Sequence, residues 1–501
     1  MLRRRWLCGL LLGGCRLTGS VAAPESVASL VTVQRWPADA EVRVDGAQGV
    51  AAERAPGAAM VRVERPGFAP TELEVVLREG EHRRLDVRLE GLPTTLQVDS
   101  VPAGAEVSID GAMVGTTPWT GEHPAGDVTV DVVLEGWQRE TVERFVDGPA
   151  LVELWLDPPD QRLDRVRLIH TCRRPKAVLL HPERDEAWVA CLAGPPSVVA
   201  HDLHTGEELA SIDLGDHGAV ELHWSADGER LYASQMETHT VHEIDVGSRE
   251  VLRTMNAVSL WSKVIERSAE GTHLFVSNWL GDDVTELRLS DGVRSRRFPT
   301  VTTPRGLYAT ADGRSLYVAG FDAGSLARID LISGRSTTLW TGGFAGRHLV
   351  ADEARGRLYL SDMGLDALFV HDMTEGTTDR LTDLIRNPNT IDLSDDREVV
   401  FASCRGQSGS GGYLTVGQRG GVFAVDAMSG RLLDAIAGGR QPTGLDVRGD
   451  WLVFSDFRDD RLQVYRIPPT EELRKGGRSL ESVKAELRLP DPVPGHPASR
   501  E

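Results

Sequence analysis

Apolar and polar residues alternate in short runs along most of this 501-residue chain, and the runs recur at two different intervals. Alternation with a period of two is typical of β-strands that bury one face. From Pro175 to Ile467 a unit of about forty residues occurs seven times. Each unit has an apolar first strand, an Asp-Gly type turn, a strand with an aromatic residue, and an apolar strand that ends before a Gly turn. This region is therefore predicted to be a repeat protein built from strands.

The aromatic strand marks the repeat most clearly. It reads EAWVAC, RLYASQ, HLFVSN, SLYVAG, RLYLSD, VVFASC and WLVFSD, beginning at Glu186, Arg230, His273, Ser315, Arg357, Val399 and Trp451. The last unit lacks a fourth strand, whereas a spare strand, Arg165–Thr171, precedes the first unit. Four strands per unit at this period are the signature of a β-propeller, in which the spare strand would complete the last blade. We predict an all-β fold with a seven-bladed β-propeller over residues 163–467, closed so that strand edges are hidden.

A second repeat precedes this region. PADAEVRVDG (Pro37–Gly46) returns as PAGAEVSIDG (Pro102–Gly111), and the Asp-Gly pair that ends each copy predicts a hairpin turn. The second copy continues into Gly-Thr-Thr-Pro (Gly115–Pro118), which the first copy lacks. These motifs resemble the PEGA domain. The resemblance implies two small β-sandwich domains, over 28–91 and 94–157, of a kind found on exported bacterial proteins. It implies attachment or interaction at the cell surface without catalysis, and a role as a spacer is equally compatible.

The strands that end in Asp before a Gly turn, such as HDLHTG, RIDLISG, HDMTEG and VDAMSG, resemble the YVTN or YncE-like propeller family. The resemblance covers about Arg165–Ile467 and implies the fold and export from the cytoplasm. Related rings include lactonases and quinoprotein-like enzymes, and one YncE-type protein is linked to DNA binding. A lactonase-like hydrolase and a DNA-binding propeller are therefore alternative functions.

The N-terminus has the pattern of an export signal within residues 1–23. Three arginines, Arg3–Arg5, precede a short apolar stretch, Trp6–Leu12. The residues that follow resemble a bacterial lipobox, which would be lipidated at Cys15; ordinary cleavage after Ala23 is the alternative. The net charge of −20 argues against binding to nucleic acid, and a lipid on Cys15 would be the chain's membrane contact. We expect an outer-membrane lipoprotein or a periplasmic or cell-surface protein.

Basic and amide residues recur where a propeller places the loops around one mouth of its central channel, although the chain is acidic. Converging cations would attract an anion, and arginine forms paired hydrogen bonds with carboxylate or phosphate. Alternatively, these side chains pair with Glu221, Asp362 and Asp456 and hold the blades together. Nearby aromatic residues would suit a ring-bearing ligand or simple packing. The predicted ligand residues are Lys176, Lys263, Arg305, Arg347, His348, Asn389, Arg405 and Arg440, and the aromatic residues are Trp261, Trp279, Phe321 and Phe457.

Other reactive side chains carry weaker signals. Cys172, Cys191 and Cys404 are expected to be buried small side chains, because their number and spacing match neither a disulfide framework nor a zinc site. The histidines clustered between His201 and His242 are expected mostly on solvent-facing strand positions. A hydrolase on the same face would need the cluster Glu221, Asp362, Asp456 and His348.

Two segments lie outside the regular repeat. The sixth unit carries about ten extra residues within Arg405–Gly421, which predict either a glycine-rich loop on the binding face with Tyr413 over the channel or a tolerated insertion without a role. The tail, residues 468–501, is expected to be partly helical, with Pro490–Glu501 disordered. We predict a non-enzymatic envelope protein without cofactor or metal, whose propeller face binds a cell-envelope component or an acidic ligand or protein.

Overall fold

The computed structural model describes residues 28–256, 259–406, 419–476 and 478–486. Its contacts divide the chain into two compact units, one of Met1–Glu135 with Arg139–Leu156, and one of Gly136–Gln138 with Asp157–Glu501. The predicted export signal with Cys15 and Ala23, the loop residue Tyr413, and the segment Pro490–Glu501 lie outside the described residues. No helix in the described part of the chain has the length and hydrophobicity needed to span a bilayer.

The first unit contains the same strand arrangement twice. The first copy has the sheets β4-β1-β8 and β3-β2-β5-β7 with the pair β6-β9, and the second copy has β13-β10-β16 and β12-β11-β14-β15. In the first copy the strands are β1 (Ser29–Trp36), β2 (Glu41–Val44), β3 (Ala47–Gln48), β4 (Ala51–Arg54), β5 (Gly57–Glu64), β6 (Phe68–Ala69), β7 (Thr71–Leu77), β8 (His82–Arg88) and β9 (Glu90–Gly91). In the second copy they are β10 (Pro93–Val101), β11 (Glu106–Ile109), β12 (Ala112–Thr116), β13 (Trp119–Pro124), β14 (Gly126–Val133), β15 (Glu140–Val146) and β16 (Ala150–Trp155).

Alternation along these strands buries one face. In β14 the side chains of Val128, Val130 and Val132 are at most 1% exposed, and the residues between them are not buried. The two Asp-Gly pairs form the predicted hairpins. Asp45 has a φ of 50° and Gly46 of 82°, and the equivalent Asp110 and Gly111 have 50° and 81°. Two consecutive positive φ angles characterise the tight turn that matches the twist of paired strands.

The two copies in the first unit are packed directly against each other. The rings of Trp36, Phe68 and Phe145 lie within 5.9 Å of one another, and the Arg65 guanidinium lies 4.8 Å from the Phe145 ring. The backbone at Gly67 lies so close to Asp147 that a Cβ at this position would collide with the Asp147 carbonyl oxygen. The contact therefore combines aromatic packing with close backbone approach.

The second unit contains seven four-stranded antiparallel sheets within the described residues. Sheet 1 has β18 (Pro175–Leu180), β19 (Glu186–Cys191), β20 (Val198–Asp202) and β21 (Glu208–Ile212); sheet 2 has β22 (Glu221–Trp224), β23 (Arg230–Gln235), β24 (Thr240–Asp245) and β25 (Glu250–Met255). Sheet 3 has β26 (Ser262–Arg267), β27 (His273–Asn278), β28 (Asp283–Arg288) and β29 (Val293–Pro299); sheet 4 has β30 (Pro304–Ala309), β31 (Ser315–Gly320), β32 (Ser325–Asp330) and β33 (Ser336–Trp340). Sheet 5 has β34 (Gly346–Asp352), β35 (Arg357–Asp362), β36 (Ala367–Asp372) and β37 (Thr378–Asp383); sheet 6 has β38 (Pro388–Leu393), β39 (Val399–Cys404), β40 (Arg419–Asp426) and β41 (Leu432–Arg440). Sheet 7 has β42 (Pro442–Arg448), β43 (Trp451–Asp456), β44 (Arg461–Arg466) and β17 (Asp164–His170).

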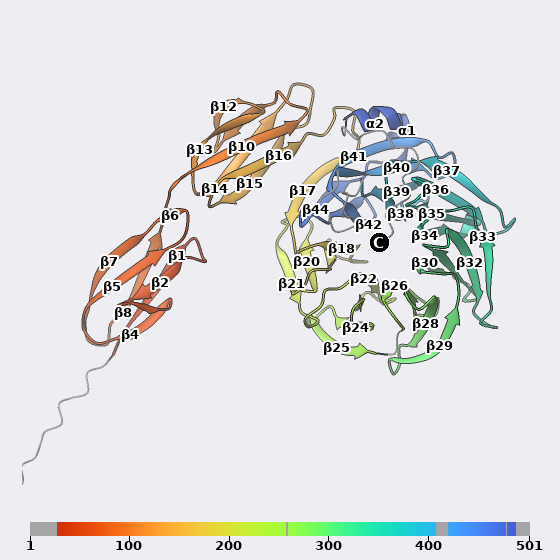
Figure 1. The fold of residues 1–501 in the computed structure, drawn as a ribbon, viewed down its shortest axis with the longest axis horizontal. Helices are drawn as coiled ribbons and strands as arrows, with labels where there is room; N and C mark the ends of the chain where they lie inside the picture. Colours follow the sequence, from red (N-terminus) through yellow and green to blue (C-terminus); the bar gives the residue numbers. More distant parts are fainter. Residues whose placement is uncertain (1–27, 257–258, 407–418, 477, 487–501) are drawn as a thin grey trace, which may run out of the picture. The chain divides into compact units, whose positions relative to one another are not determined.

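The sheets follow one another around a common centre, with their first strands innermost (Figure 1). The first strand of each sheet contacts the first strand of the next, and β42 of sheet 7 contacts β18 of sheet 1. The spare strand β17 pairs with β44, as expected from the missing fourth strand. Hydrogen bonds cross this seam: Asp446 accepts from the backbone of Leu180 at 2.6 Å, and Asp460 accepts from that of Arg174 at 2.7 Å. The end of the chain's repeat region is thus fastened to its beginning.

The turn between the third and fourth strands explains why so many repeats carry Asp and Gly. In sheet 4, Asp330 Oδ1 accepts the backbone N–H of Ser333 at 2.7 Å. Gly334 donates to the Asp330 carbonyl at 2.7 Å and has a φ of 74°. The carboxylate satisfies turn amides, and the glycine supplies the positive φ that the turn requires.

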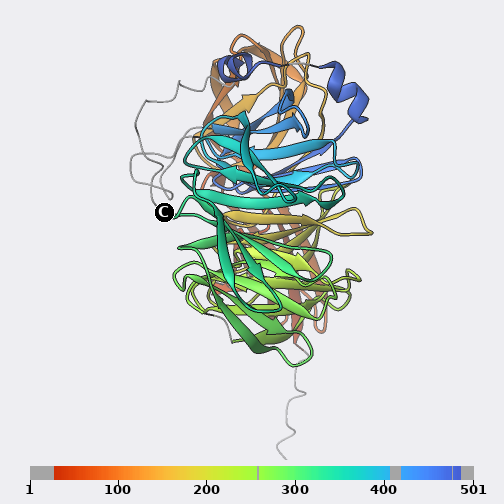
Figure 2. The same cartoon turned by 90° about the vertical axis from the view of Figure 1, so that its right-hand side faces the viewer.

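Two helices and one short 3-10 turn complete the described residues. They are η1 (Glu353–Arg355), α1 (Thr470–Lys475) and α2 (Leu480–Glu486). The helices lie where the sequence predicted short helical pieces, on the outside of the strands (Figure 2, dark blue). Buried Leu473 in α1 packs into an apolar cluster with Leu163 and Leu433, so the segment after β44 covers the outer strand β41.

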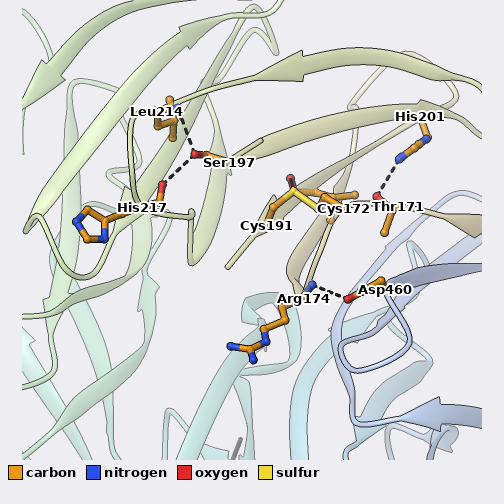
Figure 3. The surroundings of a disulfide bond; sticks show 10 residues. Thr171, Cys172, Arg174, Cys191, Ser197, His201, Leu214, His217 and Asp460 are labelled. Carbon is orange, nitrogen blue, oxygen red and sulfur yellow. Dashed lines mark hydrogen bonds between the residues drawn. A yellow bond between two sulfur atoms is a disulfide. The ribbon is translucent and has the colours of Figure 1, made fainter. Parts of the chain in front are cut away.

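One expectation about the cysteines is wrong, and the expectation that the clustered histidines mostly face solvent fails for two of them. Cys172 and Cys191 form a disulfide, with Cα atoms 5.8 Å apart, and only Cys404 is a free buried thiol among the described residues (Figure 3). The two cysteines meet because Cys172 lies three residues before Pro175, which pairs with Cys191 where β18 and β19 form a hairpin. His201 and His242 are 2% and 6% exposed, because neighbouring sheets cover both faces of their strands.

Candidate ligand site at the centre of the ring

Five of the predicted ligand residues occupy the same structural position. Each is the second residue of the innermost strand of its sheet: Lys176, Lys263, Arg305, Arg347 and Asn389. We call Lys176, Lys263, Arg305 and Arg347 the basic ring. Their side chains are 8%, 7%, 4% and 3% exposed. Four cations are therefore held on different sheets and almost removed from solvent.

Irregular strand pairing places these residues. In sheets 3 to 6 the register of the innermost strand shifts across the two residues that begin with Lys263, Arg305, Arg347 and Asn389. Such β-bulges redirect a side chain and recur next to binding sites. Serines of the neighbouring aromatic strands donate hydrogen bonds to the backbone carbonyls of the same residues. Ser234 Oγ donates to the Lys263 carbonyl at 2.6 Å, and Ser361 Oγ donates to the Asn389 carbonyl at 2.7 Å.

Glu221 is the carboxylate that several members of the basic ring share. Burial raises its pKa, and the charges of Arg305, Lys176 and Arg347 act in the opposite direction. These cations come from sheets 4, 1 and 5, whereas Glu221 begins β22 in sheet 2. The folding of distant repeats thus brings at least three cations into the range of one carboxylate, whose burial disfavours its own charged form.

Aromatic rings stand between the cations. Lys263 Nζ lies 3.6 Å from the centre of the Trp279 ring, and the Arg305 guanidinium lies 5.1 Å from the same ring. Trp279 in turn lies 4.8 Å from Phe321, and Lys176 Nζ lies 5.4 Å from Phe457. A cation over an aromatic face is stabilised without losing its positive charge. Trp279, Phe321 and Phe457 are themselves at most 5% exposed, so they pack beneath the site.

His348 and Asn389 add neutral polar groups. Burial, followed by the charges of Arg347 and Arg305, lowers the pKa of His348 to about 4. Its Nδ1 accepts the backbone N–H of Ile391 at 3.4 Å, so the neutral ring carries its proton on Nε2. Asn389 donates through Nδ2 to the Thr443 carbonyl at 2.8 Å. Its Oδ1 accepts no hydrogen bond from the described residues, although the side chain is only 1% exposed.

The last two predicted ligand residues differ from this group. Arg405 follows β39, is 1% exposed and donates its backbone N–H to the Asn387 carbonyl at 3.0 Å. Arg440 ends the outer strand β41, is exposed, and its Nε donates to Asp459 Oδ1 at 2.6 Å. Arg440 therefore forms a surface ion pair, which contributes little to stability.

Two carboxylates of the cluster that a hydrolase would need, Asp362 and Asp456, accept several hydrogen bonds within the fold. Asp362 is fully buried and accepts backbone N–H groups from Phe344, Ala345, Gly364 and Leu365. Asp456 is fully buried and accepts from Arg461 and Gln463 in its own sheet and from the backbone of Gly439. These two carboxylates hold loops and strands in place, which leaves Glu221 and His348 from the predicted set.

Sequence reasoning missed a second polar layer, at the fifth position of the innermost strands. Asp446 accepts from Leu180 of the next sheet, and Asp392 accepts from Val447 of the next sheet at 2.9 Å. Burial raises the pKa of Asp392 to about 6, and burial with the nearby Asp392 charge raises the pKa of Asp446 well above its ordinary value. The sequence signal was weak, because acidic residues stand three places after Lys263 and Asn389, whereas Leu179, Tyr308 and Val350 stand at this place in three other repeats. These carboxyls join neighbouring sheets.

A histidine and a glutamate share the same layer. His223 Nε2 lies 3.6 Å from Glu266 Oε2, and Glu266 Oε1 accepts the backbone N–H of Ala309 at 3.3 Å. Burial alone would lower the pKa of His223, and the Glu266 carboxylate outweighs it, so the pKa is raised. Within the described residues no three His, Cys, Asp or Glu side chains are grouped so as to hold a metal ion.

Comparisons with known proteins match parts of the chain. The PEGA domain family matches residues 94–146. Antigen Lp49 of Leptospira interrogans is 31% identical over 260 residues, which are 50% of this chain and 57% of that protein, so the chain spans little more than half of this relative. A chain of Kuenenia stuttgartiensis hydrazine synthase superposes with a TM-score of 0.50 and 15% identity over 59% of this chain and 96% of that chain. This last likeness shows a shared fold and nothing about chemistry. The second copy in the first unit is a PEGA domain, and the chain as a whole is an all-β protein related in part to a leptospiral antigen.

Proposed function

We propose that this chain is an exported, non-enzymatic binding protein of the bacterial cell envelope, with a site for an anionic ligand at the centre of its second unit. In this proposal the seven sheets form a closed seven-bladed β-propeller, residues 163–467, of the YVTN or YncE-like kind. The first unit consists of two PEGA modules, 28–91 and 94–157, which space the propeller from its point of attachment. Residues 468–501 form a tail, whose described helices α1 and α2 lie on the outside of the strands.

Three observations support the envelope location. The PEGA family matches residues 94–146, and the partial relative Lp49 is described as an antigen, which fits exposure at a cell surface. Cys172 and Cys191 form a disulfide, and disulfides are typical of proteins that reside in oxidising compartments. Lipidation at Cys15 would provide the anchor. Metabolic labelling with a fatty acid tests this anchor: the wild-type chain should be labelled and Cys15→Ala should not, whereas equal labelling would exclude Cys15.

The observation that carries the anion site is the presence of four buried cations at one strand position of four sheets, two of them, Lys263 and Arg305, over the same Trp279 ring. Charges held in a largely dry environment by bulged strands act more strongly on a bound ion than charges in water. Arginine is suited to paired hydrogen bonds with carboxylate or phosphate. The acidic surface of the whole chain would repel a large polyanion, so a small acidic group is favoured over DNA.

Calorimetric titration of the chain with citrate and with inorganic phosphate tests this function. We expect binding of at least one anion that weakens as the salt concentration rises. The variant Arg305→Met with Arg347→Met should lower the affinity at least tenfold. The control Arg314→Met with Arg335→Met removes two exposed charges and should change affinity less than twofold.

Thermal unfolding shows whether the double variant is folded. If it is not, the anion affinity of Glu221→Gln tests the site independently. Removal of the competing carboxylate should strengthen anion binding about threefold or more, in a chain that retains the basic ring. The function is contradicted when neither anion binds the wild-type chain, or when the two double variants behave alike.

A further inference from the structure

Four large apolar side chains are exposed in loops beside the basic ring. Leu260 is 52% exposed, Trp261 37%, Leu280 54% and Phe344 47%. Leu260 and Trp261 precede β26, Leu280 follows β27, and Phe344 precedes β34. We call these four residues the apolar rim. Large apolar groups are costly to leave in water, and a group of them beside a polar site is typical of a binding surface.

The apolar rim is continuous with the basic ring. The Trp261 ring centre lies 5.9 Å from Lys263 Nζ, and the backbone N–H of Leu280 donates to the Leu260 carbonyl at 3.3 Å. Phe344 directly precedes Ala345, which packs in one buried cluster with Trp279, Phe321 and Met363. Trp279 is also the ring that stacks against Lys263 and Arg305. One rigid base therefore supports both the apolar rim and the cations.

Burial of the cations limits the shape of the ligand. Each member of the basic ring is more than nine-tenths buried, so a broad phosphate backbone or a membrane surface cannot reach it. Glu221, His348 and Thr390, on the same innermost strands, keep part of their surface exposed. A slender anionic end group can reach the cations beside these residues while its larger part stays at the apolar rim.

Asn389 adds a requirement for a hydrogen-bond donor. Its Oδ1 accepts no hydrogen bond within the described part of the chain, and the residue follows Arg347 of sheet 5 at the equivalent position in sheet 6. A buried carbonyl oxygen without a donor costs free energy, and a ligand N–H next to the anionic group would satisfy it. Fatty acids and simple aromatic acids carry no such N–H.

We propose that the basic ring and apolar rim together bind the C-terminal end of a peptide whose last residue is large and apolar. The inference rests on the proposed function and names its ligand class. The terminal carboxylate binds the basic ring, the terminal N–H donates to Asn389 Oδ1, and the last side chain packs on the apolar rim. The positive charges of the basic ring complement the terminal carboxylate, and the apolar side chains of the rim complement the last side chain.

Titration with four small probes separates these contributions. N-acetyl-phenylalanine carries the carboxylate, the N–H and the ring. Its carboxamide lacks the charge, N-acetylglycine lacks the ring, and 3-phenylpropanoate lacks the N–H. We expect N-acetyl-phenylalanine to bind at least tenfold more tightly than the carboxamide or N-acetylglycine, and at least threefold more tightly than 3-phenylpropanoate.

Variants assign each contribution to its residues. Leu280→Ser with Phe344→Ser should weaken N-acetyl-phenylalanine about tenfold and leave N-acetylglycine unchanged. The control Val251→Ser with Leu252→Ser alters two exposed apolar residues of β25 and should change neither. Asn389→Ala should remove the advantage of N-acetyl-phenylalanine over 3-phenylpropanoate.

Each failure has its own signature. Equal binding of N-acetyl-phenylalanine and N-acetylglycine would overturn the peptide inference and leave the anion site standing. Equal binding of N-acetyl-phenylalanine and 3-phenylpropanoate would overturn it in favour of a simple amphipathic acid. Absence of binding by every carboxylate probe, together with citrate and phosphate, would overturn the proposed function as well.

Discussion

Cys172 and Cys191 are bonded in the second unit, between the segment that follows β17 and the end of β19 (Figure 3). Cys172 lies in the link between β17 of sheet 7 and β18 of sheet 1, so the bond ties this link to the end of β19. Reduction should therefore destabilise the second unit by about 3 kcal/mol, the value for a loop of this size. Thermal unfolding with and without dithiothreitol measures the loss. Cys172→Ser with Cys191→Ser should unfold at the lower temperature in both conditions; an unchanged wild-type transition on reduction would contradict this role.

Arg249 occupies a position that other repeats give to glycine. It has a φ of 63° and donates its backbone N–H to the Asp245 carbonyl at 2.8 Å, as Gly334 does to Asp330. A side chain in this conformation costs about 1 kcal/mol, partly offset by the greater freedom of glycine in the unfolded chain. Arg249→Gly should raise the free energy of unfolding by about 0.5 kcal/mol in urea titrations. Arg335→Gly, in a turn whose glycine is already present, should not stabilise the protein.

The buried pair Asp392 and Asp446 should make stability fall as the pH rises. A raised carboxyl pKa in the folded state means that the stabilisation is complete below the ordinary carboxyl pKa of about 4 and is lost as the pH rises through about 6, the pKa of Asp392. Asp392→Asn removes one of the two charges. The free energy of unfolding of Asp392→Asn minus that of the wild type should therefore be about 1–2 kcal/mol larger at pH 8 than at pH 4.

Denaturant unfolding at both pH values measures this difference. Asp379→Asn, an exposed carboxyl on the outer strand β37, is the matched control and should keep the wild-type pH profile. A pH profile of Asp392→Asn that is parallel to that of the wild type would show that Asp392 does not cause the loss of stability above pH 6.

Glu221 should couple anion binding to pH. Burial raises its pKa, so its carboxylate is protonated as the pH falls through a range above the ordinary value, and its repulsion of a bound anion then disappears. Affinity for citrate, corrected for the anion's own titration, should rise as the pH is lowered from 8 to 5. Glu221→Gln should bind as tightly at pH 8 as at pH 5. A variant that retains the full pH dependence would assign it to another group.

The sequence was most informative where the repeat dictates local structure. The seven aromatic strands predicted from EAWVAC to WLVFSD have the same bounds as β19, β23, β27, β31, β35, β39 and β43. The spare strand before the first unit was correctly expected to pair with the last, because β44 would otherwise have an open edge. Asp-Gly hairpins in the first unit followed from backbone preference alone.

Features that depend on neighbouring sheets could not be predicted in the same way. His242 alternates with Val241 as a surface residue would, yet both are buried because stacked sheets cover both faces of β24. Asp362 and Asp456 looked like site carboxylates, and only the fold shows that they accept hydrogen bonds from the backbone of neighbouring loops and strands, such as that of Gly439 in β41. The equivalent strand position of Lys176, Arg305 and Arg347 was predicted as a group, whereas the burial that raises the pKa of Glu221 follows from the packing of several sheets.

A crystal structure of the chain grown with selenate, whose anomalous scattering identifies the anion, shows whether the basic ring binds an anion. We expect a selenate ion within hydrogen-bond distance of the Arg305 and Arg347 guanidinium groups, and its loss in the Arg305→Met with Arg347→Met variant. Selenate found only on exposed surface arginines, with the basic ring closed onto Glu221, would show that the ring is a structural ion-pair network and not an anion site.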